Sequence, residues 1–145
     1  MAGSSFSTAF RVDTSDLRAL ARDLERTVPG VRREVSEVVI ESGQLVAAEA
    51  RTLSSWSSRI PGSIRVAGTL NRSVVRAGGE VAPHAPAFEH GGRPGEFRHP
   101  VFGNRNVWVG QRARPFLAPA LEAKAAAMER RLHQGVDEVF RSVRL

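Results

Sequence analysis

Arg114-Pro-Phe-Leu-Ala-Pro-Ala-Leu121 organises this 145-residue chain. Pro115 fixes φ near the helical value and has no N–H to satisfy, so it suits the first turn of a helix. Pro119 comes four residues later, about the last position at which a second proline leaves a helix intact. An apolar stripe at helical spacing follows: Leu117, Leu121, Met128, Leu132, Val136, Val139 and Val143. The stretch therefore predicts a hinge between a short strand, Val107–Val109, and a closing helix over residues 113–140.

A second long helix is predicted upstream, from Val31 to Leu53. Its apolar residues recur at helical spacing, namely Val31, Val35, Val38, Ile40, Leu45, Val46, Ala50 and Leu53. Each long helix must bury its apolar face, so we expect the two faces to pack together. The expected contact joins Leu117, Leu121, Met128 and Leu132 to Val35, Val38, Leu45 and Leu53.

The remaining elements are short. Alternating apolar and polar residues predict strands at residues 6–12, 64–66, 73–76 and 80–82. Side-chain oxygens between Asp13 and Asp16 are placed to cap a first amphipathic helix over residues 17–28. Residues 85–89 predict a short helix or turn. The Gly-, Pro- and Arg-rich segment Gly91–Asn106 predicts an extended loop that reaches a neighbouring subunit or the tail of a larger assembly.

These elements predict a single domain, residues 1–145, of the α+β class. Two long helices would pack on a small, mostly antiparallel β-sheet, with the long Gly/Pro-rich loop at residues 91–106 outside it. Residues 1–5 are small and polar and predict a loose N-terminus, and fraying is expected at residues 141–145.

Composition and charge exclude several classes of protein. The chain has no cysteine, which excludes disulfides and thiolate metal sites. No apolar run approaches the roughly 18 residues of a membrane span, and the N-terminus lacks the basic and apolar regions of a signal peptide, so no membrane partner is expected. The formal net charge is +6, and Lys124 is the single lysine. This excess suits nucleic acid or an acidic partner, but the arginines are spread along the chain, as in an Arg-rich proteome from a GC-rich genome.

The chain carries no catalytic signature. It lacks a G-x-S-x-G elbow, an S-x-x-K motif and a Gly-rich phosphate loop ending in Gly-Lys. His84, His90 and His99 lie in a Gly/Pro-rich region at spacings that match no established metal site. We therefore expect neither an enzyme nor a cofactor or metal, and interpret the histidines as surface or loop residues.

Aromatic residues are interleaved with arginines in the middle of the chain. Trp56, Phe97, Phe102 and Trp108 lie among Arg59, Arg65, Arg93, Arg98 and Arg105. Such a pattern can stack and clamp single-stranded nucleic acid. The alternative is that the aromatics fill a core or a subunit interface with arginines at its rim. The second interpretation is favoured because the aromatics flank Pro/Gly loops and do not alternate along one strand face.

Two segments resemble those of a family of phage proteins. Arg114–Leu121 resembles the RPFLRPAL segment near the C-terminus of neck proteins of long-tailed phages, which are head–tail joining or tail-completion proteins also described as tail components. Ala82-Pro-His-Ala-Pro-Ala-Phe-Glu-His-Gly91 resembles the family's APYAPYVEFG segment. Their order, their rough spacing and the long helix before them agree over roughly residues 30–135. Ile60–Ile64 departs from the family pattern, because the usual Asp-Thr-Gly turn is missing there.

The resemblance implies a structural virion protein, assembled in the bacterial host cytoplasm. It would form a homo-oligomeric ring, sixfold like a tail tube, in the neck between the head or portal connector and the tail. The expected partners are neighbouring neck and tail proteins (a stopper or adaptor, a tail terminator or the tail tube) and double-stranded DNA passing through the channel. A tail terminator or head-completion stopper ring is the nearest alternative, and a basic DNA-binding protein is the alternative from another class.

The resemblance also implies roles for individual residues. Glu89 matches the family's acidic residue and is expected to cap a turn or pair with an arginine such as Arg114. Phe88 and Phe116 sit beside fixed proline bends, where they would present rigid contacts to a neighbour. The expected subunit or partner interface consists of Phe88, Glu89, Phe97, Phe102, Trp108, Arg112, Arg114, Pro115 and Phe116.

Overall fold

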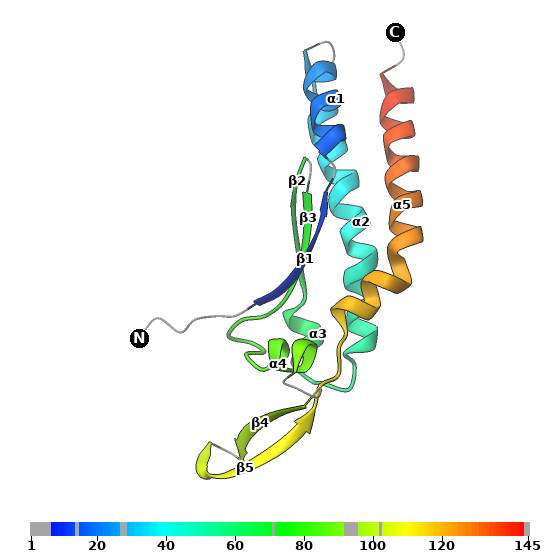
Figure 1. Cartoon of the computed structure of the whole chain (residues 1–145). Helices are drawn as coiled ribbons and strands as arrows, with labels where there is room; N and C mark the ends of the chain where they lie inside the picture. The colour runs from blue at the N-terminus through cyan, green and yellow to red at the C-terminus, as the bar shows by residue number, and fades with distance from the viewer. Residues whose placement is uncertain are drawn as a thin grey trace.

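The computed structural model describes residues 7–13, 15–26, 29–70, 72–91, 96–101 and 103–143. Along the chain the elements are β1 (Ser7–Asp13), α1 (Ser15–Glu25), α2 (Val31–Leu53), α3 (Ile60–Ser63), β2 (Arg65–Thr69), β3 (Arg72–Gly78), α4 (Ala85–His90), β4 (Glu96–Val101), β5 (Asn104–Arg112) and α5 (Leu117–Ser142). Helices α2 and α5 run side by side along an elongated molecule, a sheet lies against α2, and the β4–β5 hairpin projects from one end (Figure 1). The α+β fold is therefore as predicted.

Helices α2 and α5 pack through two clusters of buried apolar side chains. The smaller cluster contains Val31, Val35, Val39, Leu70 and Val139, with Leu132 packed against it. The larger cluster includes Val46, Ala50, Ile60, Val75, Phe88, Phe116, Leu117 and Ala120, with Leu121 and Met128 packed against it. The predicted contact between the two long helices is thus confirmed. Two of its members were wrong: Leu53 ends α2 and is exposed, and the partly buried Leu45 belongs to neither cluster.

Two glycines allow close packing against α2. A Cβ on Gly135 of α5 would overlap the side chain of Val38, and a Cβ on Gly43 of α2 would overlap the Ser73 hydroxyl of β3. Both glycines therefore lie inside continuous helices, at points where a neighbouring element approaches too closely for a side chain to fit without a shift.

The main sheet has the strand order β1-β3-β2 and is antiparallel throughout. In β3, the central strand, Ser73, Val74, Val75 and Ala77 are buried, and Ser7↔Gly78 and Arg65↔Arg76 fix the register of the outer strands. Residues 80–82, predicted as a strand, do not form one: Glu80 and the exposed Val81 lie in a bend, and the buried Ala82 is irregular. They follow the positive-φ pair Gly78 and Gly79, which turns the chain away from the sheet.

Most of the loop predicted at Gly91–Asn106 is a β-hairpin, so that prediction was wrong for the strand residues Glu96–Val101 and 104–106. Strand β4 pairs antiparallel with β5 from Glu96↔Arg112 to Val101↔Asn104, with an irregularity between Pro100 and Val101. The proline obscured the strand pattern, but a two-stranded hairpin tolerates it because edge strands can lack one N–H donor. The predicted strand at 107–109 is the centre of the longer β5. Residues 92–95 and Phe102 lie outside the described residues.

Other boundaries shift by a few residues. Helix α5 begins at Leu117, so Pro115 precedes the helix while Pro119 lies in its first turn. The helix also continues through Ser142, beyond the predicted onset of fraying; residues 144–145 are outside the described residues. Helix α2 spans Val31–Leu53 as predicted, since Gly30 adopts a left-handed conformation before it and a polar turn follows it.

Candidate functional site

The two segments that resemble the neck-protein family meet through Glu89. One carboxylate oxygen of Glu89 accepts hydrogen bonds from the backbone N–H groups of Phe116 (2.8 Å) and Leu117 (2.9 Å). The other oxygen accepts one from Ala118 (2.9 Å). The first N–H groups of a helix have no partner within it, and they favour a negative charge. The buried Glu89 side chain therefore caps α5 from the end of α4, in keeping with the predicted capping role.

The other role expected for Glu89 was an ion pair with an arginine such as Arg114, but Arg114 does not pair with it. Its backbone N–H donates to the carbonyl oxygen of Phe88 at 2.8 Å. Its guanidinium lies over the Trp56 ring, 4.4 Å from the ring centroid, where the ring quadrupole attracts the positive charge. Arg114 thus ties the segment before α5 both to α4 and to the turn after α2.

An aromatic cluster surrounds Phe88 at the root of the hairpin. The centroid of the Phe88 ring lies 4.6 Å from that of Trp56, 4.9 Å from that of Phe97 and 5.9 Å from that of His84. The Phe97 and His84 rings meet Phe88 edge-on, an arrangement favoured by aromatic quadrupoles. Burial lowers the pKa of His84, and the positive charge of Arg59 lowers this pKa further. The cluster fixes the base of β4 to the body of the protein.

Phe88, Glu89 and Phe116 were expected at an interface, but they are buried within the chain. Phe88 and Phe116 belong to the larger apolar cluster, and Glu89 is committed to the α5 cap. These side chains are buried within the chain itself, and their contact with a neighbour stays a prediction. The partly buried Phe97 packs against the same cluster.

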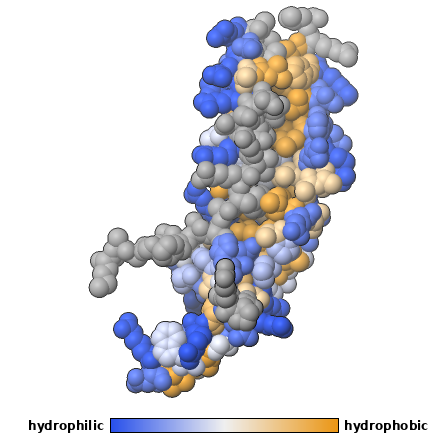
Figure 2. Space-filling view, in the orientation of Figure 1, coloured by the Kyte–Doolittle hydropathy of each residue, from blue (hydrophilic) through white to orange (hydrophobic). Residues whose placement is uncertain are grey.

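The remaining predicted interface residues are exposed. Trp108, Arg112, Arg114 and Pro115 are exposed, and Phe102 lies outside the described residues. Every residue of β5 is exposed, with relative accessibilities of 47% for Val107, 48% for Trp108 and 39% for Val109. Successive strand residues point to opposite faces, so both faces of β5 present apolar side chains to water. Figure 2 shows hydrophobic and hydrophilic surface side by side on the projecting hairpin.

The exposure of Val107 and Val109 could not be predicted from the sequence, because a Val-Trp-Val run is equally typical of a buried strand. It also missed the contact of Trp56 with Arg114 and Phe88, which come from distant parts of the chain. The Trp108 indole N–H donates to the Arg105 carbonyl oxygen at 2.7 Å, so the exposed tryptophan is held against the hairpin backbone. These exposed side chains make the hairpin the best candidate for a contact surface.

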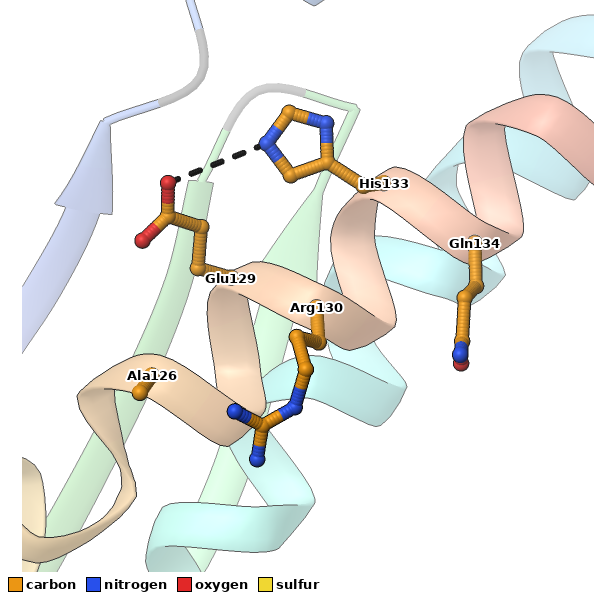
Figure 3. A pocket seen from close by; sticks show the side chains of 5 residues that line it. All are labelled: Ala126, Glu129, Arg130, His133 and Gln134. Atoms are coloured by element: carbon orange, nitrogen blue, oxygen red, sulfur yellow. Dashed lines mark ion pairs between the residues drawn. The ribbon is translucent and has the colours of Figure 1, made fainter.

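A second surface feature lies on the outer face of α5. It is a hollow of about 360 Å³ lined by Ala126, Glu129, Arg130, His133 and Gln134 (Figure 3). Glu129 and His133 lie 3.8 Å apart on successive turns, and both are exposed. The described residues that line the hollow all belong to one helix, whereas ligand pockets bury most of their ligand's surface. This hollow is therefore not a candidate ligand site.

Within the described residues, no group of three or more His, Asp or Glu side chains is placed to hold a metal ion. No described helix combines the length and the apolar character of a membrane span. Comparisons with models of known protein families, with curated proteins and with solved structures found no match.

Proposed function

We propose that this chain is a structural protein of a long-tailed phage. In this proposal it forms a homo-oligomeric ring in the neck and joins the head or portal connector to the tail. The observation that carries the proposal is the hydrogen bonding of Glu89 to Phe116, Leu117 and Ala118. These bonds join the two segments that resemble the neck-protein family, Ala82–Gly91 and Arg114–Leu121.

Two short apolar matches that arose by chance would have no reason to meet in the fold. Here residues 27 to 29 positions apart form one hydrogen-bonded unit, and the Glu89 of one match caps the helix that the other begins. The residues that match the neck-protein family are therefore residues that contact one another in the fold. This mutual dependence supports the resemblance, and through it the proposed neck function.

The hairpin fits an assembly role. It leaves the body between the two matched segments, so the Glu89 cap and the aromatic cluster set its direction (Figure 1). A lone chain leaves the apolar side chains of Val107, Trp108 and Val109 in water, at a cost that an assembly would remove.

Two alternatives remain beside this proposal. A tail terminator or head-completion stopper ring is a neighbouring position in the same assembly, built on a similarly small α+β fold. A basic DNA-binding protein is favoured by the net charge of +6 and by the exposed Arg98, Arg105 and Arg112 on the hairpin. DNA binding through phosphates would weaken steeply with salt, so a titration of double-stranded DNA at several salt concentrations measures it directly.

The test is disruption of the gene in a phage that encodes this chain. The proposal predicts DNA-filled heads and separate tails that do not join, and recovery of whole particles when the intact chain is supplied. Trp108→Asp should fail to restore joining, whereas Ala126→Asp, an exposed change on the outer face of α5, should restore it. Tails of uncontrolled length would favour the terminator, and normal particles would contradict the neck function.

A further inference from the structure

Beyond its root, the β4–β5 hairpin has no packing partner among the residues that the structure describes. Among the described residues its strands pair only with each other, and Phe97 is the hairpin side chain that packs against the core. A two-stranded hairpin is at best marginally stable in water unless a third strand or another surface covers it. The described hairpin carries three exposed arginines, Arg98, Arg105 and Arg112, and one carboxylate, Glu96. Its missing partner should therefore combine apolar surface with negative charge.

A groove with these properties lies at the far end of the same molecule. It runs between the first half of α2 and the last turns of α5, with a volume of about 210 Å³. Val38, Gly135 and Val139 are buried and form an apolar floor. Its other lining residues are Glu34, Glu37, Glu41, Glu138, Arg131 and Ser142.

The charges of the groove are only partly balanced within the chain. Arg131 binds Glu41 and lies 3.6 Å from Glu138, and Glu37 pairs with Arg33 at 3.4 Å. The Glu37, Glu41 and Glu138 side chains remain more than half exposed, and exposed pairs of this kind contribute little stability. The lining thus presents four carboxylates and a single guanidinium to an incoming chain.

We propose that the hairpin of one copy docks in the acidic α2–α5 groove of a second copy. Arginines of the hairpin would bind the groove carboxylates in the forked geometry that guanidinium groups favour, while apolar hairpin side chains cover the valine floor. The groove is smaller than the roughly 300–1,000 Å³ of small-molecule sites, and its size suits one or two inserted side chains. This proposal rests on the proposed ring, for which it names the contact between copies.

The hairpin lies at one end of the elongated chain, and the parts of α2 and α5 that line the groove lie toward the other end (Figure 1). A contact between them is heterologous, because each copy uses its hairpin on one neighbour and its groove on the other. Such a contact repeats until it closes into a ring, or continues as a filament if it does not close. Complementary charge would also favour this hairpin-to-groove contact over contacts between two hairpins or two grooves.

Disulfide trapping tests the docking mode, because the chain has no native cysteine. Asn106→Cys places a thiol on the hairpin, and Ser142→Cys places one in the groove while keeping all four carboxylates. Since these ends lie far apart within one copy, mild oxidation of the double variant should yield a ladder of linked multimers that stops at the closed ring. The matched control combines Asn106→Cys with Ala126→Cys, an exposed position on the outer face of α5. It should give at most random dimers.

Charge reversal gives a second measurement on the same double-cysteine chain. Arg105→Glu should lower the multimer yield about tenfold, and adding Glu138→Arg should restore it. Equal yields from the Ser142 and Ala126 pairs, or no multimers from the Ser142 pair at high protein concentration, would overturn the docking mode. A neck ring linked through other surfaces would overturn this contact alone. A particle neck that lacks the chain would instead overturn the proposed function.

Discussion

Replacing Glu89 with alanine removes the acceptor of three backbone hydrogen bonds at the start of α5. The N–H groups of Phe116 and Leu117 belong to buried residues, so water cannot replace the carboxylate there, whereas Ala118 is exposed. A buried donor left without a partner costs about 1–3 kcal/mol. Two such donors predict that Glu89→Ala lowers the free energy of unfolding by about 2–6 kcal/mol.

Glutamine at the same position separates charge from hydrogen bonding. The side-chain carbonyl oxygen of Glu89→Gln can still accept from Phe116 and Leu117, but its NH₂ group faces the Ala118 N–H, which is also a donor. We expect this variant to lose about 1–2 kcal/mol, the range typical of a weakened helix cap. The order of stability should therefore be wild type, glutamine, alanine.

Urea unfolding followed by tryptophan fluorescence and circular dichroism measures these differences. In a Trp108→Phe background Trp56 is the single tryptophan, and because it packs against Phe88 its emission reports on the capped junction. Glu129→Ala is the matched control, because this exposed carboxylate of α5 pairs with His133 on the surface and should change stability by less than about 0.5 kcal/mol. A loss within about 0.5 kcal/mol for Glu89→Ala as well would refute the claim that the cap holds the two segments together.

Three further predictions concern the packing of the long helices and the Arg114 contact. Leu117→Ala should cost about 2–5 kcal/mol in the same titration, since Leu117 is buried, whereas Leu53→Ala should change stability by less than about 0.5 kcal/mol because Leu53 is exposed; equal losses would contradict this core. Gly135→Ala should lower the free energy of unfolding by about 1–3 kcal/mol, although alanine favours helices more than glycine does, because the new methyl group would clash with Val38. Adding Val38→Ala should relieve much of that loss. Additive effects of the two changes in a double-mutant cycle would exclude a direct clash. Arg114→Met should lose about 0.5–1 kcal/mol of cation–π attraction and shift the Trp56 emission spectrum, and an unchanged spectrum would show that the stacking is absent in solution.

The helices could be predicted from the sequence because their signals are local. The apolar repeat from Val31 to Leu53 is bounded by a Pro-Gly pair and a serine-rich turn, and these features predicted both ends of α2. The strand β4 could not be predicted, because Pro100 and the neighbouring Gly/Pro composition mask its alternation. Its stability depends on pairing with β5, which a pattern within one segment does not record.

The candidate site divides in the same way. Phe88, Glu89 and Phe116 were predicted from the sequence as interface residues. An apolar side chain that contacts a neighbouring subunit and one that packs in the core have the same local sequence pattern. Burial separated them, and the capping partner of Glu89 proved to be a helix that starts 28 residues later in the chain. For the exposed hairpin the sequence predicted the aromatic and basic residues, but not the paired strands that present them.

Cryo-electron microscopy of the assembled particle tests whether this chain forms the proposed ring in the phage neck. We expect a closed ring of identical copies around the tail axis, between the portal and the tail tube, with each hairpin seated on the adjacent copy. Particles labelled on the chain's C-terminus would identify the ring by its added density. A single copy of the chain, or copies on the capsid shell away from the portal axis, would contradict the account.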